Sequence, residues 1–289
     1  MEINYNSATE LDTLLKTEGL AMRKRYGQNF LTNPDARLRL ADSLEAKAGD
    51  EVWEIGPGLG AMTRLLLDRG FRVKAFEVDP GFIRLLQKIF GKEAGFSLIE
   101  GDVLKTWPSQ EPAPLLLGNL PYNIAAVLIG DLIEGQRFFR RMVVTVQKEL
   151  AQRMTAAPGS ENYSSFTVLC NSVYHAKKIM SIHRTSFYPQ PHVDSCAVKL
   201  DHITEHKYPG LFYPLVRALF ASRRKMIKNN LNDFLSAVLG DGIENKKIDE
   251  ISAELLAMNR LTGMERAENL NLATFAGLAQ TLEDMRLLG

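Results

Sequence analysis

The stretch that decides the fold is Glu54-Ile55-Gly56-Pro57-Gly58-Leu59-Gly60, directly after the apolar pair Val52-Trp53. Residues 51–55 are predicted to form a strand, and a helix through residues 65–67 follows the glycines. Glycines at a strand-to-helix turn let the backbone approach a ligand closely at the carboxyl edge of a parallel sheet. The stretch therefore predicts a ligand site at that edge.

The chain on either side of this turn alternates between strand and helix patterns. Further strands are predicted at 71–78, 96–100, 115–118 and 142–146, with helices at 82–90 and 124–133. This alternation predicts an α/β fold with a parallel sheet and helices on both faces. Two later segments, 178–182 and 196–200, flank a Pro-rich loop and fit an antiparallel pair at one sheet edge.

The two ends of the chain differ from this core. Helical apolar patterns occupy 215–235, 248–258 and 272–282, so we expect a small all-helical domain over 207–289 after a first domain over 1–206. Residues 7–18 predict a short amphipathic helix in an amino-terminal arm, and we expect that arm to pack on the first domain.

Two carboxylates follow neighbouring strands of the predicted sheet. Glu77 ends the second strand, where it can accept hydrogen bonds from both hydroxyls of a ribose. Asp102 follows the third strand and can accept from an adenine amino group. Gly56-x-Gly58-x-x-Ala61 also fits the dinucleotide fingerprint, so a nicotinamide dehydrogenase stays open. Pro57 argues against a pyrophosphate, since it removes a backbone N–H from the loop.

The fourth strand runs into Asn119-Leu120-Pro121-Tyr122, which we interpret as the reactive site. An adenine amino nitrogen is a poor nucleophile because its lone pair is delocalised into the ring. Two acceptors on its hydrogens favour a pyramidal nitrogen, and the Asn119 side chain and the Leu120 carbonyl can be those acceptors, with Pro121 fixing the local backbone. Tyr122 offers a ring on which the base can stack.

These motifs, in this order, resemble the ribosomal RNA adenine dimethyltransferases, and most closely the bacterial small-subunit type. The resemblance covers most of the chain and rests on six segments: 27–31 (Gly-Gln-Asn-Phe-Leu), 54–60, 77–79 (Glu-Val-Asp), 101–104 (Gly-Asp-Val-Leu), 119–122, and 187–195 (Phe-Tyr-Pro-Gln-Pro-His-Val-Asp-Ser). The chain departs from the family pattern at Ala125-Ala126-Val127 and at Ser164-Ser165-Phe166.

The resemblance implies a Rossmann-like class I methyltransferase fold and S-adenosylmethionine as the cofactor. It implies that Phe187 is a second ring across the target base from Tyr122. The cofactor-binding residues that it implies, together with those reasoned above, are Gln28, Asn29, Leu31, Gly56, Gly58, Gly60, Glu77, Asp102, Val103 and Asn119. The implied substrate is two adjacent adenosines in the 3′-terminal hairpin loop of 16S rRNA in pre-30S particles, each methylated twice.

Composition limits the other classes of function. Apolar residues make up 45% of the 289 residues and the net charge is +1, so RNA affinity has to come from a local basic surface. We expect that surface near the start of the helical domain, at Arg223, Arg224, Lys225 and Lys228. The two cysteines lack metal-site spacing, and no metal is expected. The chain shows no signal peptide or membrane span, which predicts a cytoplasmic protein, and we expect a monomer.

Three other interpretations stay open. The large-subunit enzyme that confers antibiotic resistance is the nearest, although Leu120 and the long helical tail favour the small-subunit type. A protein or DNA amine methyltransferase would share the Asn-x-Pro-Tyr chemistry. A ribosome-assembly checkpoint would bind pre-30S particles whether or not it methylates them.

Overall fold

The computed structural model describes residues 3–23, 26–203, 208–240 and 244–285. The chain forms two compact units. The first contains residues 1–151 and 175–202, and the second contains residues 152–174 and 203–289. The domain boundary expected between residues 206 and 207 lies outside the described residues. The structure groups residues 152–174 with the carboxyl-terminal helices.

The first unit is built on a seven-stranded sheet of order β4-β3-β2-β5-β6-β9-β7. Its strands are β2 (Glu51–Ile55), β3 (Arg72–Glu77), β4 (Phe96–Glu100), β5 (Leu115–Asn119), β6 (Arg141–Gln147), β7 (Tyr174–Ile182) and β9 (Ser195–His202). The first five are parallel, and β9 is antiparallel to β6. The predicted parallel α/β sheet is confirmed.

The two late strands lie at the predicted edge of the sheet. Cys196 Sγ is 3.2 Å from the carbonyl oxygen of Met180, and the Ile203 N–H donates to the carbonyl of Val173 at 2.8 Å. Residue numbers therefore rise on β9 as they fall on β7, which is an antiparallel arrangement. The prediction placed β7 over 178–182, but the strand begins four residues earlier, at Tyr174.

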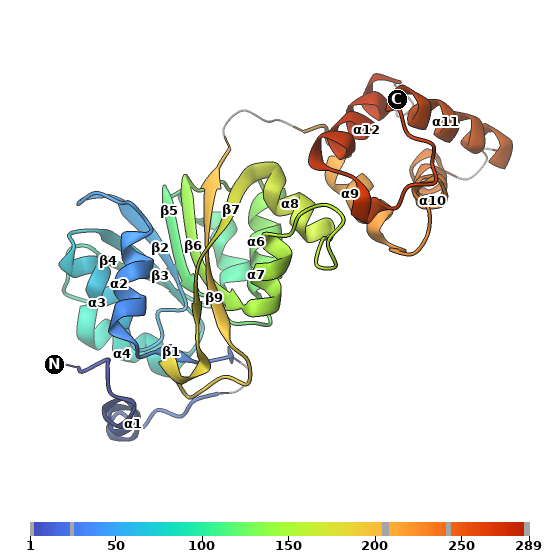
Figure 1. Cartoon of the computed structure of the whole chain (residues 1–289). Helices are drawn as coiled ribbons and strands as arrows, with labels where there is room; N and C mark the ends of the chain where they lie inside the picture. The colour runs from blue at the N-terminus through green and yellow to red at the C-terminus, as the bar shows by residue number, and fades with distance from the viewer. Residues whose placement is uncertain (1–2, 24–25, 204–207, 241–243, 286–289) are drawn as a thin grey trace. The chain divides into compact units, whose positions relative to one another are not determined.

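Helices cover both faces of this sheet (Figure 1). They are α2 (Pro34–Asp42), α3 (Ala61–Asp68), α4 (Pro80–Phe90), α5 (Val103–Thr106), α6 (Ala125–Glu134) and α7 (Lys148–Met154). Figure 1 shows α2 and α3 on one side of the strands and α6 and α7 on the other. Trp53, fully buried in β2, packs against Phe76 and Phe139 with ring centroids 4.8 and 5.2 Å apart.

The amino-terminal arm packs on the first unit, as expected. Its helix α1 (Ala8–Thr17) is capped by Ser7, whose hydroxyl accepts from the Glu10 N–H. Leu11 and Leu15 are 1% and 3% exposed and form a cluster with Phe30, Leu59, Phe82 and Leu85. The arm thereby supports Phe30 and Phe82.

Two segments far apart in the sequence form a small second sheet. Strand β1 (Phe30–Leu31) pairs antiparallel with β8 (Phe187–Tyr188), with Phe30 opposite Tyr188 and Leu31 opposite Phe187. The hydroxyl of Tyr188 donates to Asp12 on α1 at 2.7 Å. This pairing joins the arm, the segment before α2 and the Pro-rich loop.

The second unit is helical. It contains α8 (Ser165–Val173), α9 (Phe212–Phe220), α10 (Ile227–Leu239), α11 (Asn245–Met258) and α12 (Leu272–Asp284) around one apolar core. The helical apolar pattern over 215–235 covers parts of two helices, because α9 ends at Phe220 and α10 begins at Ile227. The side-chain amide of Asn230 donates to the carbonyls of Leu219 and Ser222, at 2.8 and 3.3 Å, and satisfies the end of α9.

No described helix combines the length and the apolar character needed to cross a membrane.

Candidate functional site

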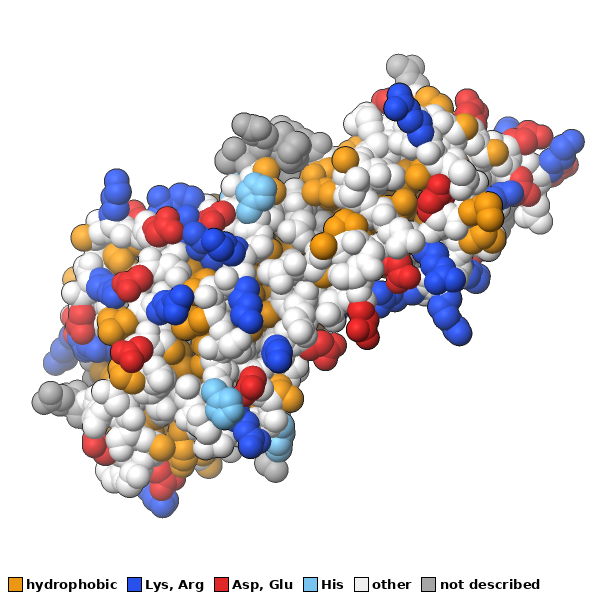
Figure 2. Space-filling view, in the orientation of Figure 1, with side chains coloured by type: hydrophobic (Ala, Val, Ile, Leu, Met, Phe, Trp, Pro, Cys, Tyr) orange, Lys and Arg blue, Asp and Glu red, His pale blue; other side chains and the backbone are white. Residues whose placement is uncertain are grey.

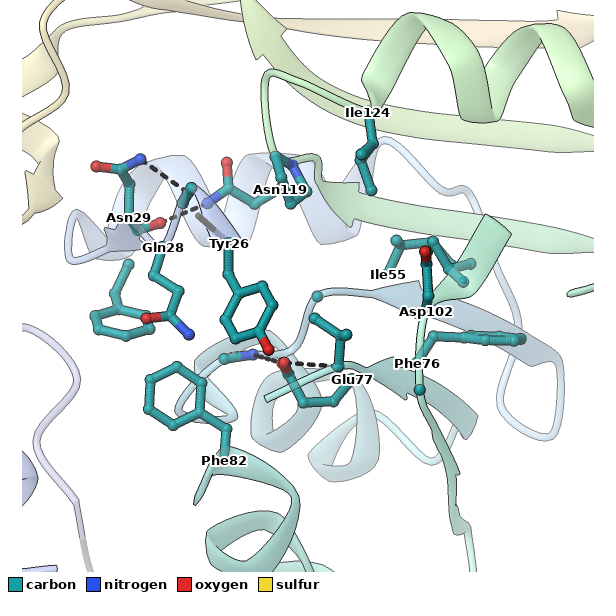
Figure 3. A pocket seen from close by; sticks show the side chains of 18 residues that line it. Tyr26, Gln28, Asn29, Ile55, Phe76, Glu77, Phe82, Asp102, Asn119 and Ile124 are labelled. Carbon is teal, nitrogen blue, oxygen red and sulfur yellow. Dashed lines mark hydrogen bonds between the residues drawn. The ribbon is translucent and has the colours of Figure 1, made fainter. Parts of the chain in front are cut away.

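A cavity opens at the carboxyl ends of β2, β3 and β5. Its walls come from the segment before β1, the glycine turn after β2, the end of β3, the start of α5 and the loop after β5 (Figure 3). The predicted residues that line it are Gln28, Asn29, Gly56, Gly58, Glu77, Asp102, Val103, Asn119 and Pro121. Residues predicted from separate motifs therefore meet at one site.

The glycine turn is held against the end of β3. Gly58 has a φ of +57°, and a Cβ there would meet the ring of Phe30 at 2.9 Å. Its N–H donates to Glu77 Oε2 at 3.3 Å. A side chain at residue 58 would disturb both the turn and the aromatic wall, so glycine is required at this position.

Glu77 is the buried carboxylate of the cavity. It is 6% exposed, and its Oε1 accepts from the N–H groups of Val78 and Asp79 at 2.9 and 2.8 Å. Burial raises the pKa of this carboxyl to about 7, although the three backbone N–H donors oppose that shift. Figure 3 shows the ring of Tyr26 pointing toward Glu77 across the cavity.

Asp79, directly after Glu77, connects the cavity to α4 and to the arm. Its Oδ1 caps α4 by accepting from the Gly81 N–H at 2.8 Å, and its Oδ2 accepts from the Gln28 amide at 3.1 Å. The Gln28 oxygen in turn accepts from the Arg23 N–H at 2.7 Å. Gln28 is therefore fixed by hydrogen bonds at both ends of its amide.

Asp102 is the amino-terminal cap of α5. Its Oδ1 accepts from the Leu104 N–H at 3.1 Å. Within the part of the chain that the structure describes, Oδ2 has no partner, so it can accept a hydrogen bond from a ligand in the cavity. The Asp102 carboxylate therefore caps α5 with one oxygen, and its other oxygen is available for the role predicted from the sequence, as an acceptor for an adenine amino group.

The amide of Asn119 has a defined orientation. Its Nδ2 donates to the main-chain carbonyl of Asn29 at 2.7 Å, while the Asn29 amide donates to the carbonyl of Gly27 at 3.0 Å (Figure 3). Among the described residues nothing donates to Asn119 Oδ1 or to the Leu120 carbonyl. Two acceptors at the end of β5 therefore have free lone pairs, which is what the sequence predicted for a reacting amine.

The ring of Tyr122 is held from behind. Its hydroxyl is 2.7 Å from the hydroxyl of Ser195 at the start of β9, and Ser195 is 1% exposed. Partial burial raises the pKa of Tyr122, so the phenol is neutral at physiological pH. The Pro121 carbonyl accepts from the N–H groups of Ile124 and Ala125 and thereby begins α6.

Five predicted site residues lie away from the wall of this cavity: Leu31, Gly60, Leu120, Tyr122 and Phe187. Leu31 and Phe187 are 6% and 3% exposed and pack in the core cluster beneath α2. Gly60, with a φ of +88°, begins α3, and a Cβ there would overlap the ring of Phe90. Leu31 and Gly60 hold the neighbouring segments in place. A stacking role for Phe187 stays a prediction.

The basic residues predicted to bind RNA belong to the second unit. Arg223 pairs with Glu268 at 3.0 Å, Lys225 with Asp233 at 3.6 Å and Lys228 with Asp249 at 3.2 Å. Arg224 is exposed and pairs with none of the described residues. The sequence alone could not show these carboxylate partners, because the fold brings them close from other segments of the chain.

The cavity fits the adenosine end of S-adenosylmethionine. Glu77 Oε2, which accepts from one backbone N–H, can also accept from a ribose hydroxyl, Asp102 offers an acceptor for an amino group, and Val103 and Phe82 give apolar walls. The unpartnered acceptor at Asn119 lies at the same cavity. These acceptors and apolar walls are therefore those of a nucleoside site. Beside it lie two further acceptors, the Asn119 amide oxygen and the Leu120 carbonyl.

Comparisons with known proteins identify the family of the chain. Residues 19–259 match the family model described as ribosomal RNA adenine dimethylase. Proteins named ribosomal RNA small subunit methyltransferase A are similar: that of Treponema denticola is 46% identical, covering 96% of each chain, and that of Bacillus pumilus is 34% identical, covering 97% of this chain and 99% of that one.

Solved structures show the same fold. A dimethyladenosine transferase from Plasmodium falciparum superposes with a TM-score of 0.76 at 26% identity, covering 87% of this chain and 96% of that one. The 23S rRNA methyltransferase ErmE superposes with a TM-score of 0.65 at 22% identity, covering 88% and 99%. The chain belongs to the ribosomal RNA adenine dimethylase family, and it is an S-adenosylmethionine-dependent rRNA adenine dimethyltransferase.

Proposed function

We propose that the chain methylates N6 of two adjacent adenosines in the 3′-terminal hairpin loop of 16S rRNA, acting as a monomer on pre-30S particles in the cytoplasm. The names of the relatives support the small-subunit substrate. The observation that carries the chemistry is the Asn119 amide, whose nitrogen is bound to Asn29 and whose oxygen is free beside the Leu120 carbonyl.

The cofactor supplies an electrophilic methyl group on a sulfonium. The residues that would hold it are those of the cavity, with Glu77 at the ribose, Asp102 and Val103 at the adenine, and Gln28, Asn29 and the glycine turn toward the methionine end. Leu31 and Gly60 would act from behind this wall, since they hold β1 and α3.

The residues of the loop after β5 prepare the nucleophile. Asn119 Oδ1 and the Leu120 carbonyl accept the two N6 hydrogens and favour a pyramidal nitrogen, and Tyr122 supports the base by stacking. Unstacking the target adenosine costs a few kcal/mol, least in a single-stranded loop. Positioning therefore accounts for most of the catalysis, and the methylated ammonium then loses its proton to water.

We also propose that Phe187 is a second ring that stacks on the target base. Because it is 3% exposed, that role requires base binding to uncover it. We also propose that the particle is contacted by Arg223, Arg224, Lys225 and Lys228. Arg224 pairs with none of the described residues, so it can bind a phosphate without breaking an ion pair, unlike the other three. A substitution of Arg224 should therefore weaken particle binding more than one of Lys228.

Reverse transcription tests the proposed substrate, because N6,N6-dimethyladenosine blocks base pairing. Unmethylated small-subunit particles and, separately, unmethylated large-subunit RNA are incubated with the protein and S-adenosylmethionine. New stops at two adjacent adenosines near the 3′ end of 16S rRNA are expected. Stops confined to the large-subunit RNA would show that the substrate assignment is wrong while the chemistry stands.

Cofactor affinity should rise with pH through about 7. The ionised Glu77 carboxylate is the better acceptor for ribose hydroxyls, and its pKa of about 7 in the free protein leaves it partly protonated below that pH. Cofactor binding then lowers this pKa, and affinity should fall about tenfold between pH 8 and pH 6. Calorimetry at pH 6, 7 and 8 measures this.

Two variants control for other groups. Glu77→Gln should bind weakly at every pH and lose the pH dependence. Glu54, whose pKa burial also raises to about 7, hydrogen-bonds Thr63 at 2.7 Å and lies outside this cavity wall. Glu54→Gln should therefore keep the dependence. A flat profile in the unaltered protein would remove Glu77 as the titrating acceptor.

Leu15→Ala should weaken cofactor binding without a direct contact. The substitution leaves a void beside Phe82 and Phe30, both of which line the cavity. Core Leu→Ala changes cost about 2–5 kcal/mol, and here the loss falls on the packing of α1. Hydrogen exchange of α1 should speed up and the Kd for the cofactor should increase. The exposed Thr13→Ala on the same helix is the control, and equal effects of the two variants would refute a role for the arm.

A further inference from the structure

Three exposed cations surround the support of the Tyr122 ring. Lys148 begins α7 directly after β6, Lys178 lies in the edge strand β7, and Arg184 lies in the short 3-10 helix Arg184–Ser186 after it. We call these three residues the reactive-loop cations. They come from three elements, so no single run of sequence marks them as a group.

Hydrogen bonds fix two of them to the segment that holds Tyr122. The backbone N–H of Lys148 donates to the Asp194 carbonyl at 3.1 Å, and that of Arg184 donates to Asp194 Oδ1 at 3.0 Å. Asp194 directly precedes Ser195, whose hydroxyl is 2.7 Å from that of Tyr122. Hydrogen bonds through Asp194 and Ser195 thus connect the backbones of Lys148 and Arg184 to the Tyr122 ring.

Lys178 lies near the same segment, at Cys196. Burial raises the pKa of the Cys196 thiol, and the charges of Lys178 and Lys148 oppose that rise. Cys196 follows Ser195, and its Sγ is 3.2 Å from the carbonyl of Met180, two residues beyond Lys178. All three residues therefore lie around residues 194–196.

The reactive-loop cations have no ion-pair partner among residues 3–23, 26–203, 208–240 and 244–285. The acid nearest to them, Asp194, uses Oδ1 for the Arg184 N–H, and this oxygen is 3.8 Å from His183 Nε2. Glu149, exposed beside Lys148, is a second acid in the area. By contrast, Arg223, Lys225 and Lys228 are each paired with a carboxylate.

Unpaired surface cations attract phosphates more strongly than paired ones, because no carboxylate has to be displaced. Figure 2 shows Lys, Arg and His side chains over the side of the molecule where β7 and β9 face the viewer. We propose that Lys148, Lys178 and Arg184 bind the phosphates on either side of the target adenosine and hold that strand while its base stacks on Tyr122. This inference rests on the proposed function in two respects, that the target lies in small-subunit RNA and that its base stacks on Tyr122.

The test replaces all three cations by alanine. The matched control removes Arg39, Lys47 and Lys92, which are also exposed and unpaired among the described residues and belong to α2 and to loops at the amino edge of the sheet. Each variant loses three positive charges, so a general change in net charge affects both equally. Calorimetry with S-adenosylmethionine shows whether each variant is folded.

Two readouts are measured for each variant. The first is the salt dependence of binding to single-stranded oligoadenylate, and the second is KM and kcat for unmethylated small-subunit particles. Three lost phosphate contacts should flatten the slope of log K against log salt by about 2. We expect KM to rise at least tenfold with a smaller change in kcat, and the control to match the unaltered protein. A Lys148→Arg, Lys178→Arg, Arg184→Lys variant should recover most of the affinity.

Equal salt slopes and KM values in the alanine variant and the control would overturn the proposal. The variant that exchanges Lys and Arg keeps all three charges. Its failure to recover binding would also overturn the proposal, because a structural role would then explain the loss. If the unaltered protein does not methylate the particles, the proposed substrate is wrong. The oligoadenylate slopes still decide whether these cations bind phosphates.

Discussion

Asn119→Ala should lower kcat for methyl transfer by about 10²–10³, with a much smaller change in the Kd for S-adenosylmethionine. The substitution removes one of two oriented acceptors from the reacting amine, and the loss of one such oriented dipole typically costs that much. Single-turnover transfer of labelled methyl groups measures the rate, and calorimetry measures the affinity. A kcat within threefold of the unaltered protein would show that the amine is not activated at Asn119.

Asn119→Asp keeps an acceptor oxygen at residue 119 but removes the amide N–H that orients the side chain. Asn119 Nδ2 donates to the Asn29 carbonyl at 2.7 Å, so a carboxylate there would set a negative oxygen against a carbonyl oxygen. The unpaired acceptors cost about 1–3 kcal/mol, which corresponds to a rate loss of roughly tenfold to a hundredfold. Full activity in Asn119→Asp would contradict the claim that the amide nitrogen fixes the side chain.

Glu77→Ala should weaken S-adenosylmethionine binding about a hundredfold or more. It removes the ribose acceptor and leaves the N–H groups of Gly58, Val78 and Asp79 without their partner. A hydrogen bond to a charged group contributes about 1.5–3 kcal/mol and an unpaired buried N–H costs about 1–3 kcal/mol, which together give an effect of this size. Calorimetry measures the Kd.

The chain offers a matched control for Glu77→Ala. Glu100 lies opposite Glu77 in the register of β3 and β4, but it is exposed and hydrogen-bonds Gln87. Glu100→Ala should leave the Kd within about twofold. Equal losses in the two variants would show that general negative charge at this edge, rather than the buried acceptor, determines affinity.

The parts of the fold set by local patterns were predictable. The run of apolar residues before Gly56 and the repeated strand–helix alternation predict β2 to β6, and parallel strands bring their carboxyl ends to one edge. For this reason the sequence alone places Glu77 and Asn119, the last residues of β3 and β5, and Asp102, two residues beyond β4, at one edge of the sheet.

The parts set by contacts between distant segments were not predictable. Strands β1 and β8 have two residues each, too few for a periodic pattern, and they pair across more than 150 residues of sequence. The break between α9 and α10 depends on Asn230 capping the end of α9, while the apolar spacing continues through it. Helix α2 was missed although Asn33-Pro34 is a strong start signal, with Asn33 accepting from the Ala36 N–H at 2.9 Å.

The same distinction holds for the site. The sequence identified Asn119 as an acceptor, but the partner that orients it is a main-chain carbonyl 90 residues away. The sequence also identified the basic residues at 223–228, but it did not separate Lys228, which pairs with Asp249, from Arg224, which pairs with none of the described residues. Pairing depends on which carboxylates the fold brings close.

Nucleoside mass spectrometry tests the central claim most directly. Unmethylated small-subunit particles are incubated with the protein and S-adenosylmethionine that carries a labelled methyl group, and the RNA is digested to nucleosides. We expect labelled N6,N6-dimethyladenosine from the unaltered protein and almost none from Asn119→Ala at saturating cofactor. Label found in another nucleoside, or equal amounts of dimethyladenosine from both proteins, would contradict the central claim.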